Sequence, residues 1–443
     1  MYTHDDTIVA PATASGGALS VIRLSGERAV EIADRLFRGR KPLAESRPAT
    51  VRYGLICDGE RIVDDVVATL FRAPNSYTGE DSVEFSCHGS QYITSEIIRL
   101  AVEAGARLAT AGEFTSRAFL AGRIDLSQAE AVADMIAADS QAAHAMASTQ
   151  LRGGYSSELN SLRADLLRLT SLLELELDFS EEDVTFADRA QLRQTMGEIG
   201  RHISRLKESF QLGNAIREGV AVAIIGAPNA GKSTLLNRLL GENRAMVSEI
   251  AGTTRDTIEE RMNIDGVVFR FIDTAGLHET SDRLEQMGIE RTKEALERAQ
   301  IVVVLNDGLN AVPKVSLSEN QRLIEVANKM DLRQGESIAD GVISISALTG
   351  EGVEELLRAI RSAVDTRSLY AGDSIVSSAR HREALHHAGE ALNRAIEALD
   401  SDLPTDLLSE DIRQVLHHIG CITGDITSDE ILQSIFSKFC IGK

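Results

Sequence analysis

The sequence predicts an α+β N-terminal domain, an all-α helical domain that is split in sequence, and an α/β domain inserted between the two helical parts. A chain of 443 residues is long enough for two or three domains. Strand-like and helix-like segments alternate over residues 1–121 and 217–372, whereas 122–216 and 373–443 have helical periodicity only. We take these four ranges as the predicted domain boundaries. An insertion of this kind is tolerated when the termini of the inserted domain lie close together.

The N-terminal segment contains short apolar runs separated by polar turns, which is typical of an α+β domain. The expected strands cover residues 6–10, 17–24, 50–57, 63–71 and 82–88, and the expected helices cover 27–37 and 92–104. No catalytic constellation stands out in this segment. The pattern therefore predicts a binding or dimerisation module.

The helical segments are recognised by leucine and alanine spacing and by their end signals. A capping box at Ser127–Glu130 predicts one alanine-rich helix that continues to about Leu151. A later helix begins near Ala187 and is expected to end at Gly213. The other expected helices cover 156–177, 377–399, 403–419 and 428–439, the last of them opened by a second capping box at residues 427–430.

Composition and charge restrict the possible partners. Hydrophobic residues make up 43% and charged residues 26% of the chain, the balance of a soluble globular protein. The formal net charge of −21 argues against broad, non-specific nucleic-acid binding, which needs a basic surface. No run is long enough to span a bilayer, and the four cysteines are widely spaced. We therefore expect no membrane association and a reducing, cytoplasmic location.

The most informative stretch runs from Gly226 to Ser233 and has the pattern G-x-x-x-x-G-K-S. It follows an apolar strand-like run and precedes a helix-like one, so backbone N–H groups and a helix start can surround one phosphate. Lys232 can reach the outer phosphates, and Ser233 can offer its hydroxyl to Mg²⁺. The residues expected to contact the nucleotide here are Asn229, Ala230, Gly231, Lys232, Ser233 and Thr234.

Further motifs lie next to predicted strands of the same segment, which cover 220–225, 267–272, 301–305, 323–327 and 342–346. Asp273 is placed to hold the Mg²⁺ shell, and the Gly276 N–H is placed to meet a γ-phosphate. A threonine of the pair Thr253 and Thr254 can complete the Mg²⁺ coordination. The threonine pair precedes a strand, whereas Asp273 follows one and so lies at the carboxyl end of a parallel strand, where such sheets bind ligands.

Base selectivity is predicted from the stretch Asn328–Asp331. The Asp331 carboxylate can accept from the N1–H and the exocyclic amine of guanine, a donor pair that adenine lacks. Lys329 can lie along the base, and Ser346 with Ala347 can offer a backbone N–H to the guanine oxygen. In this order, the motifs are specific for a Ras-like P-loop GTPase domain.

Two residues bear on how GTP would be hydrolysed. Leu277 stands where Ras-like proteins have the glutamine that orients the attacking water. Either hydrolysis is lost, or another group does this work, and the loop 278–285 offers carboxylates. Asn229 has an amide oxygen beside the β- and γ-phosphates, which suits a monovalent cation; otherwise it is a tolerated loop residue.

Several stretches together resemble the MnmE (TrmE) family of bacterial tRNA-modification GTPases, from one end of the chain to the other. The loops around Gly226, Ala251 and Asp273 are shared with other potassium-activated GTPases. More specific to the family are D-T-I-V-A, T-G-E-D, and the stretch from Arg117 to Ala131. The most specific is the terminal F-C-I-G-K, which ends at Lys443.

The resemblance implies roles for individual residues. The implied potassium ligands are Asn229, Ser248, Ile250 and Thr253, the implied magnesium ligands are Ser233 and Thr254, and the implied folate-site residues are Arg23, Glu80, Arg123 and Lys443. As metal ligands, Ser248, Thr253 and Thr254 would also line the GTP site. Glu285 matches the glutamate that positions the hydrolytic water. Cys440 matches a cysteine that the family requires. Arg123 stands where a lysine is often found, which keeps the charge but alters the donor geometry.

The same resemblance implies a function and partners. GTP hydrolysis, with K⁺ and Mg²⁺, would drive a conformational cycle in a homodimer. The partner would be the flavoprotein MnmG (GidA), in a heterotetramer, carrying FAD and holding most of the tRNA. A bound 5-formyl- or 5,10-methylene-tetrahydrofolate would serve the addition of aminomethyl or carboxymethylaminomethyl groups at C5 of the wobble uridine, position 34.

Two other classes of function remain as alternatives. A ribosome- or RNA-assembly switch GTPase would share the nucleotide motifs, but it would need a basic RNA-binding domain, and the C-I-G-K end would be unexplained. A GTP-dependent structural protein would assemble through its long helices. That class ranks last, because no heptad pattern is sustained over several repeats.

Overall fold

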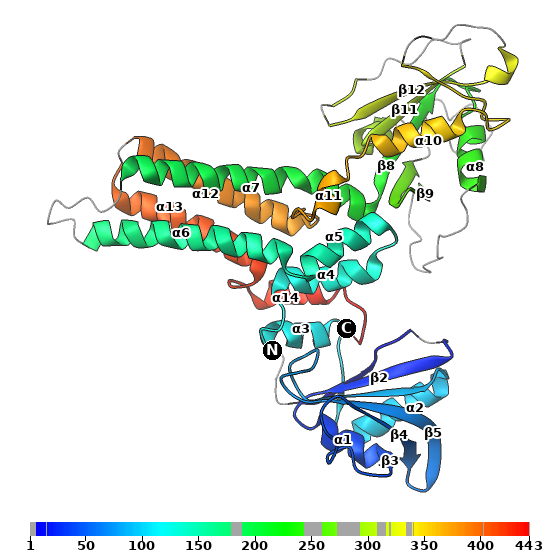
Figure 1. Cartoon of the computed structure of the whole chain (residues 1–443), viewed down its shortest axis with the longest axis vertical. Coiled ribbons are helices and arrows are strands. Elements are labelled where there is room, and N and C mark those ends of the chain that lie inside the picture. The colour runs from blue at the N-terminus through cyan, green and yellow to red at the C-terminus, as the bar shows by residue number, and fades with distance from the viewer. Residues whose placement is uncertain are drawn as a thin grey trace. The chain divides into compact units, whose positions relative to one another are not determined.

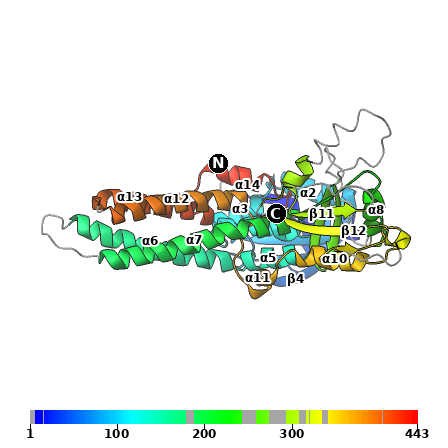
Figure 2. The same ribbon diagram turned by 90° about the horizontal axis from the view of Figure 1, so that it is seen from above.

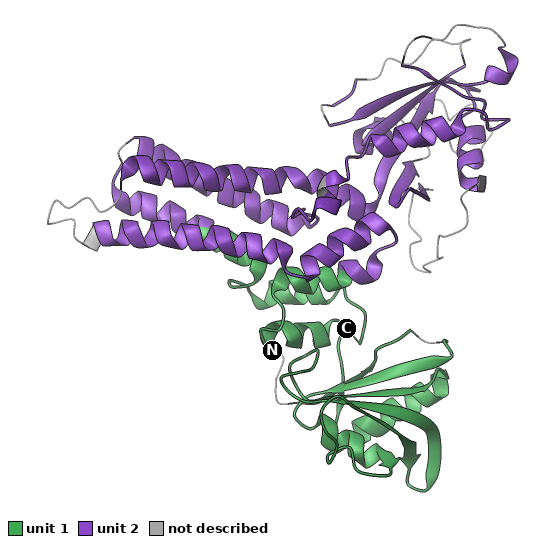
Figure 3. Ribbon diagram, in the orientation of Figure 1, with its two compact units in different colours: residues 1–133, 416–443 green, residues 134–415 purple. Residues whose placement is uncertain are grey.

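The computed structural model describes most of the chain, in two compact units that we take in turn (Figure 3). The described residues are 6–14, 16–178, 188–242, 259–272, 293–307, 316–318, 320–333, 339, 341–401 and 403–442. The first unit joins Met1–Ala133 to Leu416–Lys443, and the second is Asp134–Val415. Among the described helices, none is long and apolar enough to cross a membrane.

The first unit is built on a seven-stranded sheet with the order β3-β4-β5-β6-β2-β1-β7. Its strands are β1 (Ile8–Pro11), β2 (Leu19–Ser25), β3 (Phe37–Gly39), β4 (Thr50–Asp58), β5 (Arg61–Phe71), β6 (Ser82–His88) and β7 (Arg107–Leu108). The five strands expected from the sequence are present. The short strands β3 and β7 form the two edges and were not predicted, because two or three residues carry no readable alternation.

Two helices pack on this sheet, α1 (Ala29–Leu36) and α2 (Gln91–Glu103), as the helical spacing predicted (Figure 1). Ile32 on α1 and Ile97 on α2 are fully buried in one cluster with Ile22, Val66 and Phe85 of the strands. The apolar faces of both elements are therefore buried against each other, which confirms the α+β prediction for this segment.

The last helix of the chain belongs to the first unit. It is α14 (Asp429–Phe436), and it packs with α3 (Glu113–Leu120) and α4 (Leu126–Ala137). Leu432, Ile435 and Phe436 form one apolar cluster with Leu126 and Ala129. The chain terminus is therefore held by apolar burial close to residues 112–129.

In the structure, both helix caps lie at other residues than the sequence predicted. The Asp125 carboxylate accepts from the Gln128 N–H at 2.9 Å, and the Gln128 side chain accepts from the Asp125 N–H at 2.9 Å, so the box begins at Asp125 rather than at Ser127. At α14 the N-cap is Ser428, whose hydroxyl accepts from Ile431 N at 3.4 Å. Neighbouring Asp, Ser and Thr residues offer similar caps, so the packing of each helix selects among them.

The long helices of the second unit lie side by side in two views (Figure 1 and Figure 2). They are α6 (Gly154–Asp178), α7 (Arg189–Glu218), α12 (Ala379–Asp400) and the first part of α13 (Thr405–Thr423), with the shorter α5 (Gln141–Leu151) and α11 (Arg367–Ala371) beside them. The single alanine-rich helix predicted for 127–151 is in fact two helices. Ser140 interrupts it in an extended conformation and caps α5 by accepting from Ala143 N at 3.1 Å.

The prediction that a helix ends at Gly213 was wrong. α7 continues through Gly213 to Glu218. A Cβ atom at Gly213 would lie 2.2 Å from the Val376 carbonyl oxygen, so the glycine lets the next segment of backbone approach the helix. Gly200 of α7 and Leu392 of α12 also lie close together, and these helices stand on opposite sides of the inserted domain in sequence. The helices of the second unit on the two sides of the insertion therefore pack together, so the insertion splits a helical body.

The inserted domain is a six-stranded sheet of order β13-β12-β11-β8-β10-β9. Its strands are β8 (Val220–Gly226), β9 (Glu259–Ile264), β10 (Val267–Ile272), β11 (Ile301–Asn306), β12 (Arg322–Ala327) and β13 (Ile343–Ser344). The parallel strands were all predicted. β9 was missed: it is the antiparallel edge strand, paired with β10 from Glu259 to Ile264. Only Met262 and Ile264 of its six residues are buried, so its apolar signal is weak.

Both faces of this sheet are covered. Val222 and Ile224 of β8 face a cluster with Leu235 and Leu239 of α8 (Lys232–Glu242) and with the buried residues of α10 (Val353–Ser362). The alternate residues Ala223 and Ile225 face a second cluster that includes Ala295 and Ala299. A strand buried on both sides reads as an uninterrupted apolar run, which is why β8 was easy to predict.

Candidate functional site

The loop between β8 and α8 has the form of a phosphate-binding loop. β8 ends at Gly226 and α8 begins at Lys232, so the loop leads straight into a helix N-terminus. A Cβ atom at Gly226 would lie 2.5 Å from Leu305 O, and Gly231 has a φ of 99°. The Lys232 ammonium donates to the carbonyl oxygens of Gly226 at 2.9 Å and Ala227 at 3.0 Å. The lysine therefore lies over the loop, where a phosphate would be held.

Polar groups at the mouth of this loop are accessible. Asn229 is exposed and has a φ of 63°, a left-handed conformation that asparagine tolerates better than most residues. Ser233 and Thr234 are exposed in the first turn of α8, whereas Ala230 is fully buried. Of the residues expected to contact the nucleotide, Ala230 is therefore buried in the loop, and the polar residues Asn229, Ser233 and Thr234 are accessible.

Asn328 connects three loops. Its amide NH₂ donates to Ala230 O at 2.7 Å, and its amide oxygen accepts from Ala347 N at 2.9 Å. A Cβ atom on Gly231 would lie 2.3 Å from the same NH₂ group. Asn328 is only 2% exposed, so its role in this structure is to hold the phosphate loop against the base-binding loops.

The predicted base-binding side chains lie next to Asn328. The Ser346 hydroxyl donates to the Asp331 carboxylate at 2.7 Å, which fixes its orientation. Lys329 has a φ of 66° and donates to Asp307, 2% exposed, at 3.2 Å. The structure therefore brings together the ends of β8, β12 and β13, as the motif order predicted. Ser248, Ile250, Thr253, Thr254, Asp273, Gly276, Leu277 and Glu285 lie outside the described residues.

A second polar site surrounds the turn at residues 77–80 of the first unit. The Arg23 guanidinium lies over the rings of Tyr77 at 5.3 Å and Phe114 at 5.5 Å, and its Nε donates to Glu84 at 2.7 Å. Burial raises the pKa of the Tyr77 phenol, whose oxygen lies 2.8 Å from the Thr115 hydroxyl. Arg23 is thereby held by ring faces on one side and by a carboxylate on the other.

The other two described candidates of this site lie at the same turn. Glu80 accepts from the Ser25 hydroxyl at 2.7 Å and from Arg117, whose nitrogen lies 3.1 Å from the carboxylate. The side-chain carbons of Arg123 lie close to Gly79, as shown by the short distance of 3.5 Å from a Cβ built there. Arg23, Glu80 and Arg123 therefore converge on one turn, although they are far apart in sequence.

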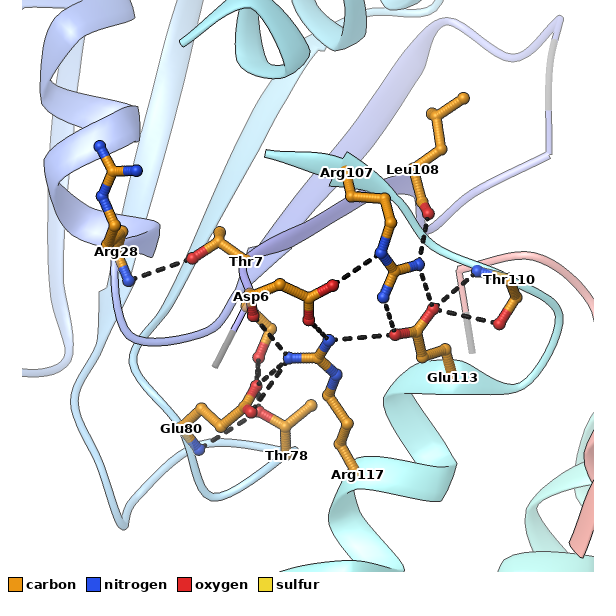
Figure 4. A network of polar contacts seen from close by, with 11 residues as sticks. Asp6, Thr7, Arg28, Thr78, Glu80, Arg107, Leu108, Thr110, Glu113 and Arg117 are labelled. Carbon is orange, nitrogen blue, oxygen red and sulfur yellow. Dashed lines mark hydrogen bonds and ion pairs between the residues drawn. The ribbon is translucent and has the colours of Figure 1, made fainter. Parts of the chain in front are cut away.

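Next to Glu80 lies a network of charged residues, of which Glu113 and Arg117 are buried (Figure 4). Arg117 donates to the Asp6 carbonyl oxygen at 2.9 Å and to Glu113 at 3.0 Å. Burial works to raise the pKa of Asp6, but hydrogen bonds from Arg107 and Arg117 outweigh it and lower the pKa. Burial also works to raise the pKa of Glu113, but hydrogen bonds from Arg107 and from the Thr110 N–H outweigh the effect of burial and lower this pKa.

The C-terminal tail reaches this unit's sheet edge. Gly112 N donates to Cys440 O at 3.4 Å, and Ala111 forms an antiparallel bridge with Ile441. A Cβ atom at Gly442 would lie 2.0 Å from Pro11 O. Pro11 is the last residue of β1, and Ala10 before it pairs with Arg23. The tail therefore lies at the end of β1, next to the residue that pairs with Arg23, with Cys440 exposed.

Comparisons with known proteins show which family the chain belongs to. A family model described as the MnmE helical domain matches residues 126–440, and one described as the TrmE N-terminus of a GTP-binding protein matches 7–123. The tRNA modification GTPase MnmE of Cytophaga hutchinsonii is 50% identical over 453 residues, covering 99% of this chain and 98% of that protein. This chain belongs to the MnmE family.

Two further similarities, to a second relative and to a solved structure, differ in how far they support the family assignment. MnmE of Bacteroides fragilis is 48% identical over 464 residues, covering 99% of this chain and all of that protein. Among solved structures, the G domain of the T. maritima FeoB iron transporter is 25% identical over 33% of this chain and 99% of that chain. Its TM-score of 0.25 is too low to carry an argument. The family assignment therefore rests on the MnmE relatives and models.

Membership of the MnmE family, whose curated members are tRNA modification GTPases, agrees with the GTP-binding motifs of the inserted domain. It also decides between the classes considered from the sequence, in favour of the tRNA-modification GTPase. Of the residues that the MnmE resemblance implied, Asn229, Ser233, Arg23, Glu80, Arg123 and Cys440 are described, and Lys443 lies outside the described residues.

The sequence did not reveal several residues that shape these sites. Asn328 was expected among the GTP-binding residues, and the structure adds that its amide connects two loops; a buried asparagine in a loop is a signal for such a role only once burial is known. Tyr77 and Phe114, which flank Arg23, carried no signal because they lie on separate segments. The four-residue spacing of Glu113 and Arg117 could have suggested an ion pair on α3.

Proposed function

We propose that this protein is a potassium-activated GTPase that modifies C5 of the wobble uridine, position 34, of certain tRNAs to aminomethyl or carboxymethylaminomethyl derivatives. It would act as a homodimer with the flavin-dependent MnmG (GidA), which would hold FAD and most of the tRNA. GTP hydrolysis would drive the conformational cycle in the cytoplasm. We keep the predicted domain boundaries at 121/122, 216/217 and 372/373 as part of this proposal.

The observation that carries the potassium part is the placement of Asn229. It is an exposed residue of the phosphate loop, with a left-handed backbone conformation. An amide oxygen suits a monovalent cation, and such a cation, when bound, supplies positive charge beside the β- and γ-phosphates. Ser248, Ile250 and Thr253 would complete the ligands, Ser233 and Thr254 would hold Mg²⁺, and Asp273 would support its shell.

Catalysis needs a group that positions water, because Leu277 cannot do so. We assign this role to Glu285. Lys232 and the N–H groups at the start of α8 would bind the phosphates, and Gly276 would meet the γ-phosphate. Asp331, Lys329 and the Ser346–Ala347 loop would hold guanine. Asn328 would keep this loop and the phosphate loop at a fixed distance from each other.

The site at residues 77–80 suits a tetrahydrofolate derivative. A pterin ring presents N–H donors, which the Glu80 carboxylate can accept, and the glutamate part of folate carries carboxylates that Arg23 or Arg123 can bind. Arg123 is exposed, whereas Arg23 is held by Tyr77 and Phe114. Lys443 and Cys440 of the tail would complete this site, Cys440 as a catalytic residue.

The proposal is tested by phosphate release from GTP in potassium and in sodium. We expect potassium to raise the rate by at least about tenfold, which corresponds to about 1.4 kcal/mol of barrier lowering. Because Asn229 has a φ of 63°, Asn229→Gly removes the amide without backbone strain and should abolish the potassium response while GTP still binds.

Two further measurements separate the parts of the proposal. Glu285→Ala should hydrolyse GTP slowly but still dimerise in potassium with a transition-state mimic, as measured by sedimentation. Equal rates in both salts for the wild-type protein would refute potassium activation. For the pathway, copurification with a flavoprotein and loss of modified wobble uridine on deletion are expected; a deletion strain with normal uridine would refute that part.

A further inference from the structure

The feature behind this inference is a buried ion pair on α3. Glu113 and Arg117 are separated by four residues, and their side chains are 3.0 Å apart. Glu113 is 0% exposed and Arg117 is 2% exposed. Burying two charges costs free energy unless each charge also forms hydrogen bonds with other groups. The other contacts of Glu113 and Arg117 therefore show what the pair does.

Arg117 uses its other donors on the folate side. It donates to Glu80 at 3.1 Å and to the Asp6 carbonyl oxygen at 2.9 Å. Its Nε atom is buried with no partner among the described residues. Among the described residues, the Glu80 carboxylate otherwise accepts only from the Ser25 hydroxyl, at 2.7 Å, and the Glu80 backbone N–H donates to the Thr78 hydroxyl. Arg117 is therefore the main charged group that orients the Glu80 carboxylate.

Glu113 uses its remaining lone pairs on the tail side. It accepts from the Thr110 N–H at 2.8 Å and from the Thr110 hydroxyl at 3.1 Å. Arg107 donates to both of its oxygens, at 2.6 and 3.1 Å. These bonds fix the turn formed by Thr110, Ala111 and Gly112, which we call the tail-binding turn.

The tail-binding turn is where the chain terminus is held. Ala111 bridges Ile441, and Gly112 N donates to Cys440 O at 3.4 Å. Gly112 has a φ of 68°, and a Cβ atom there would lie 2.6 Å from Phe436 O. The turn must therefore keep one conformation for the tail to dock, and Glu113 enforces it.

We propose that the Glu113–Arg117 pair positions Glu80 and the tail-binding turn together, so that folate binding and docking of the Cys440 tail depend on each other. Glu113 and Arg117 are positioning residues: they act through Glu80 and Thr110. This inference rests on the proposed function, in that Glu80 is taken as a folate ligand. By linkage, folate must stabilise the docked tail by the same factor by which the docked tail favours folate.

The test uses the full chain and two variants, Glu113→Gln and Arg117→Lys. Gln keeps the shape of Glu113 but turns an NH₂ donor toward the N–H groups of Arg107 or Arg117. Lys keeps the charge at 117 but cannot reach Glu80, Asp6 and Glu113 at once. The matched control is Glu103→Gln, because Glu103 forms an exposed pair with Arg99 on α2, at the same spacing, away from the site.

Two readouts are measured on each protein. Calorimetry with 5-formyltetrahydrofolate gives the folate affinity. Hydrogen exchange of peptides covering 109–114 and 437–442 reports tail docking, and a peptide from α2 serves as the internal reference for the sheet. The wild-type protein is measured with and without the folate.

We expect both variants to lose folate affinity by about tenfold or more, the effect of losing a charge-assisted hydrogen bond. Exchange in the two tail peptides should rise by a similar factor, while the α2 peptide and the control variant stay unchanged. Added folate should slow tail exchange in the wild-type protein. The less disruptive Arg117→Lys should show both effects even if Glu113→Gln is poorly folded.

Other outcomes would overturn the inference. If α2 exchange rises as much as tail exchange in both variants, the pair is merely structural. If folate binds but leaves wild-type tail exchange unchanged, docking and binding are independent. If the wild-type protein does not bind folate, the folate part of the proposed function fails instead; the claim for the tail-binding turn is then decided by the tail peptides alone.

Discussion

We propose that base selectivity depends on Asp331, whose carboxylate accepts a hydrogen bond from the Ser346 hydroxyl at 2.7 Å. Asp331→Asn replaces one acceptor oxygen by a donor. We expect GTP affinity to fall by about tenfold or more and xanthosine triphosphate affinity to rise. Competition against a fluorescent guanine nucleotide measures both.

The control for this change is Asp265→Asn, in the exposed turn between β9 and β10. Asp265 has a φ of 47°, a conformation that asparagine also tolerates, so this variant should bind GTP normally. Equal GTP binding by wild type and Asp331→Asn would refute the assignment of Asp331 to the base.

Glu113 also predicts a pH dependence of stability. Its pKa is lowered in the folded protein from an ordinary value of 4.5, because Arg107, Thr110 and Arg117 outweigh burial. The unfolded chain therefore binds the proton more readily, and the stabilisation is present above pH 4.5 and lost as the pH falls through the lower folded value.

We expect the unfolding free energy of the first unit to fall below this pH by up to about 1.4 kcal/mol per pH unit for this one group. Asp6 adds to the loss at still lower pH, since its pKa is also lowered, from an ordinary value of 3.8. Urea unfolding at several pH values, monitored by hydrogen exchange of the α2 amides, measures this free energy. Glu113→Gln should flatten the acid slope, and an unchanged slope would contradict the role of Glu113.

At the scale of elements, α7 provides a comparison between two glycines of one helix. A Cβ atom at Gly213 would lie 2.2 Å from Val376 O, whereas one at Gly197 would have nothing closer than 3.7 Å, at the end of the Arg193 side chain. Alanine favours a helix over glycine by about 1 kcal/mol. Gly197→Ala should therefore be neutral or stabilising.

Gly213→Ala makes the same gain in helix propensity but forces the Val376 backbone away. Overpacking of this kind costs about 1–3 kcal/mol, so we expect net destabilisation of the second unit in urea unfolding. If both alanine variants had the same stability, the close approach of the backbone at Gly213 would not be a constraint on the fold.

At the scale of the whole molecule, the nucleotide site and the tail belong to different compact units. Deleting residues 440–443 removes the contacts to Gly112 and Pro11 but leaves the phosphate loop intact. We expect tRNA modification to be lost, with GTP hydrolysis nearly unchanged. Mass spectrometry of tRNA nucleosides and phosphate release measure the two activities.

Cys440→Ser separates the thiol from the docking of the tail, because the contacts to Gly112 N and Ala111 are made by the backbone. This variant should retain protected exchange in the tail peptide while losing modification. Normal modification after the deletion would mean that the tail is only a chain terminus.

The sequence by itself determined the three kinds of domain, the parallel strands of the inserted sheet and the order of the nucleotide motifs. These features are local: a buried parallel strand such as β8 reads as a continuous apolar run, and a phosphate loop is made of consecutive residues between a strand and a helix. The residues of the folate site came only from a resemblance, because Arg23, Glu80 and Arg123 share no local pattern.

Only the tertiary structure decided which caps are used, that α7 passes through Gly213, and that Asn328 connects the phosphate loop to the base loops. It also decided that Arg117 stands between Glu80 and the tail-binding turn. Each of these depends on a partner distant in sequence, such as Val376 for Gly213. Helix propensity and capping patterns differ by about 1 kcal/mol between alternatives, and burial against a distant partner contributes more than that.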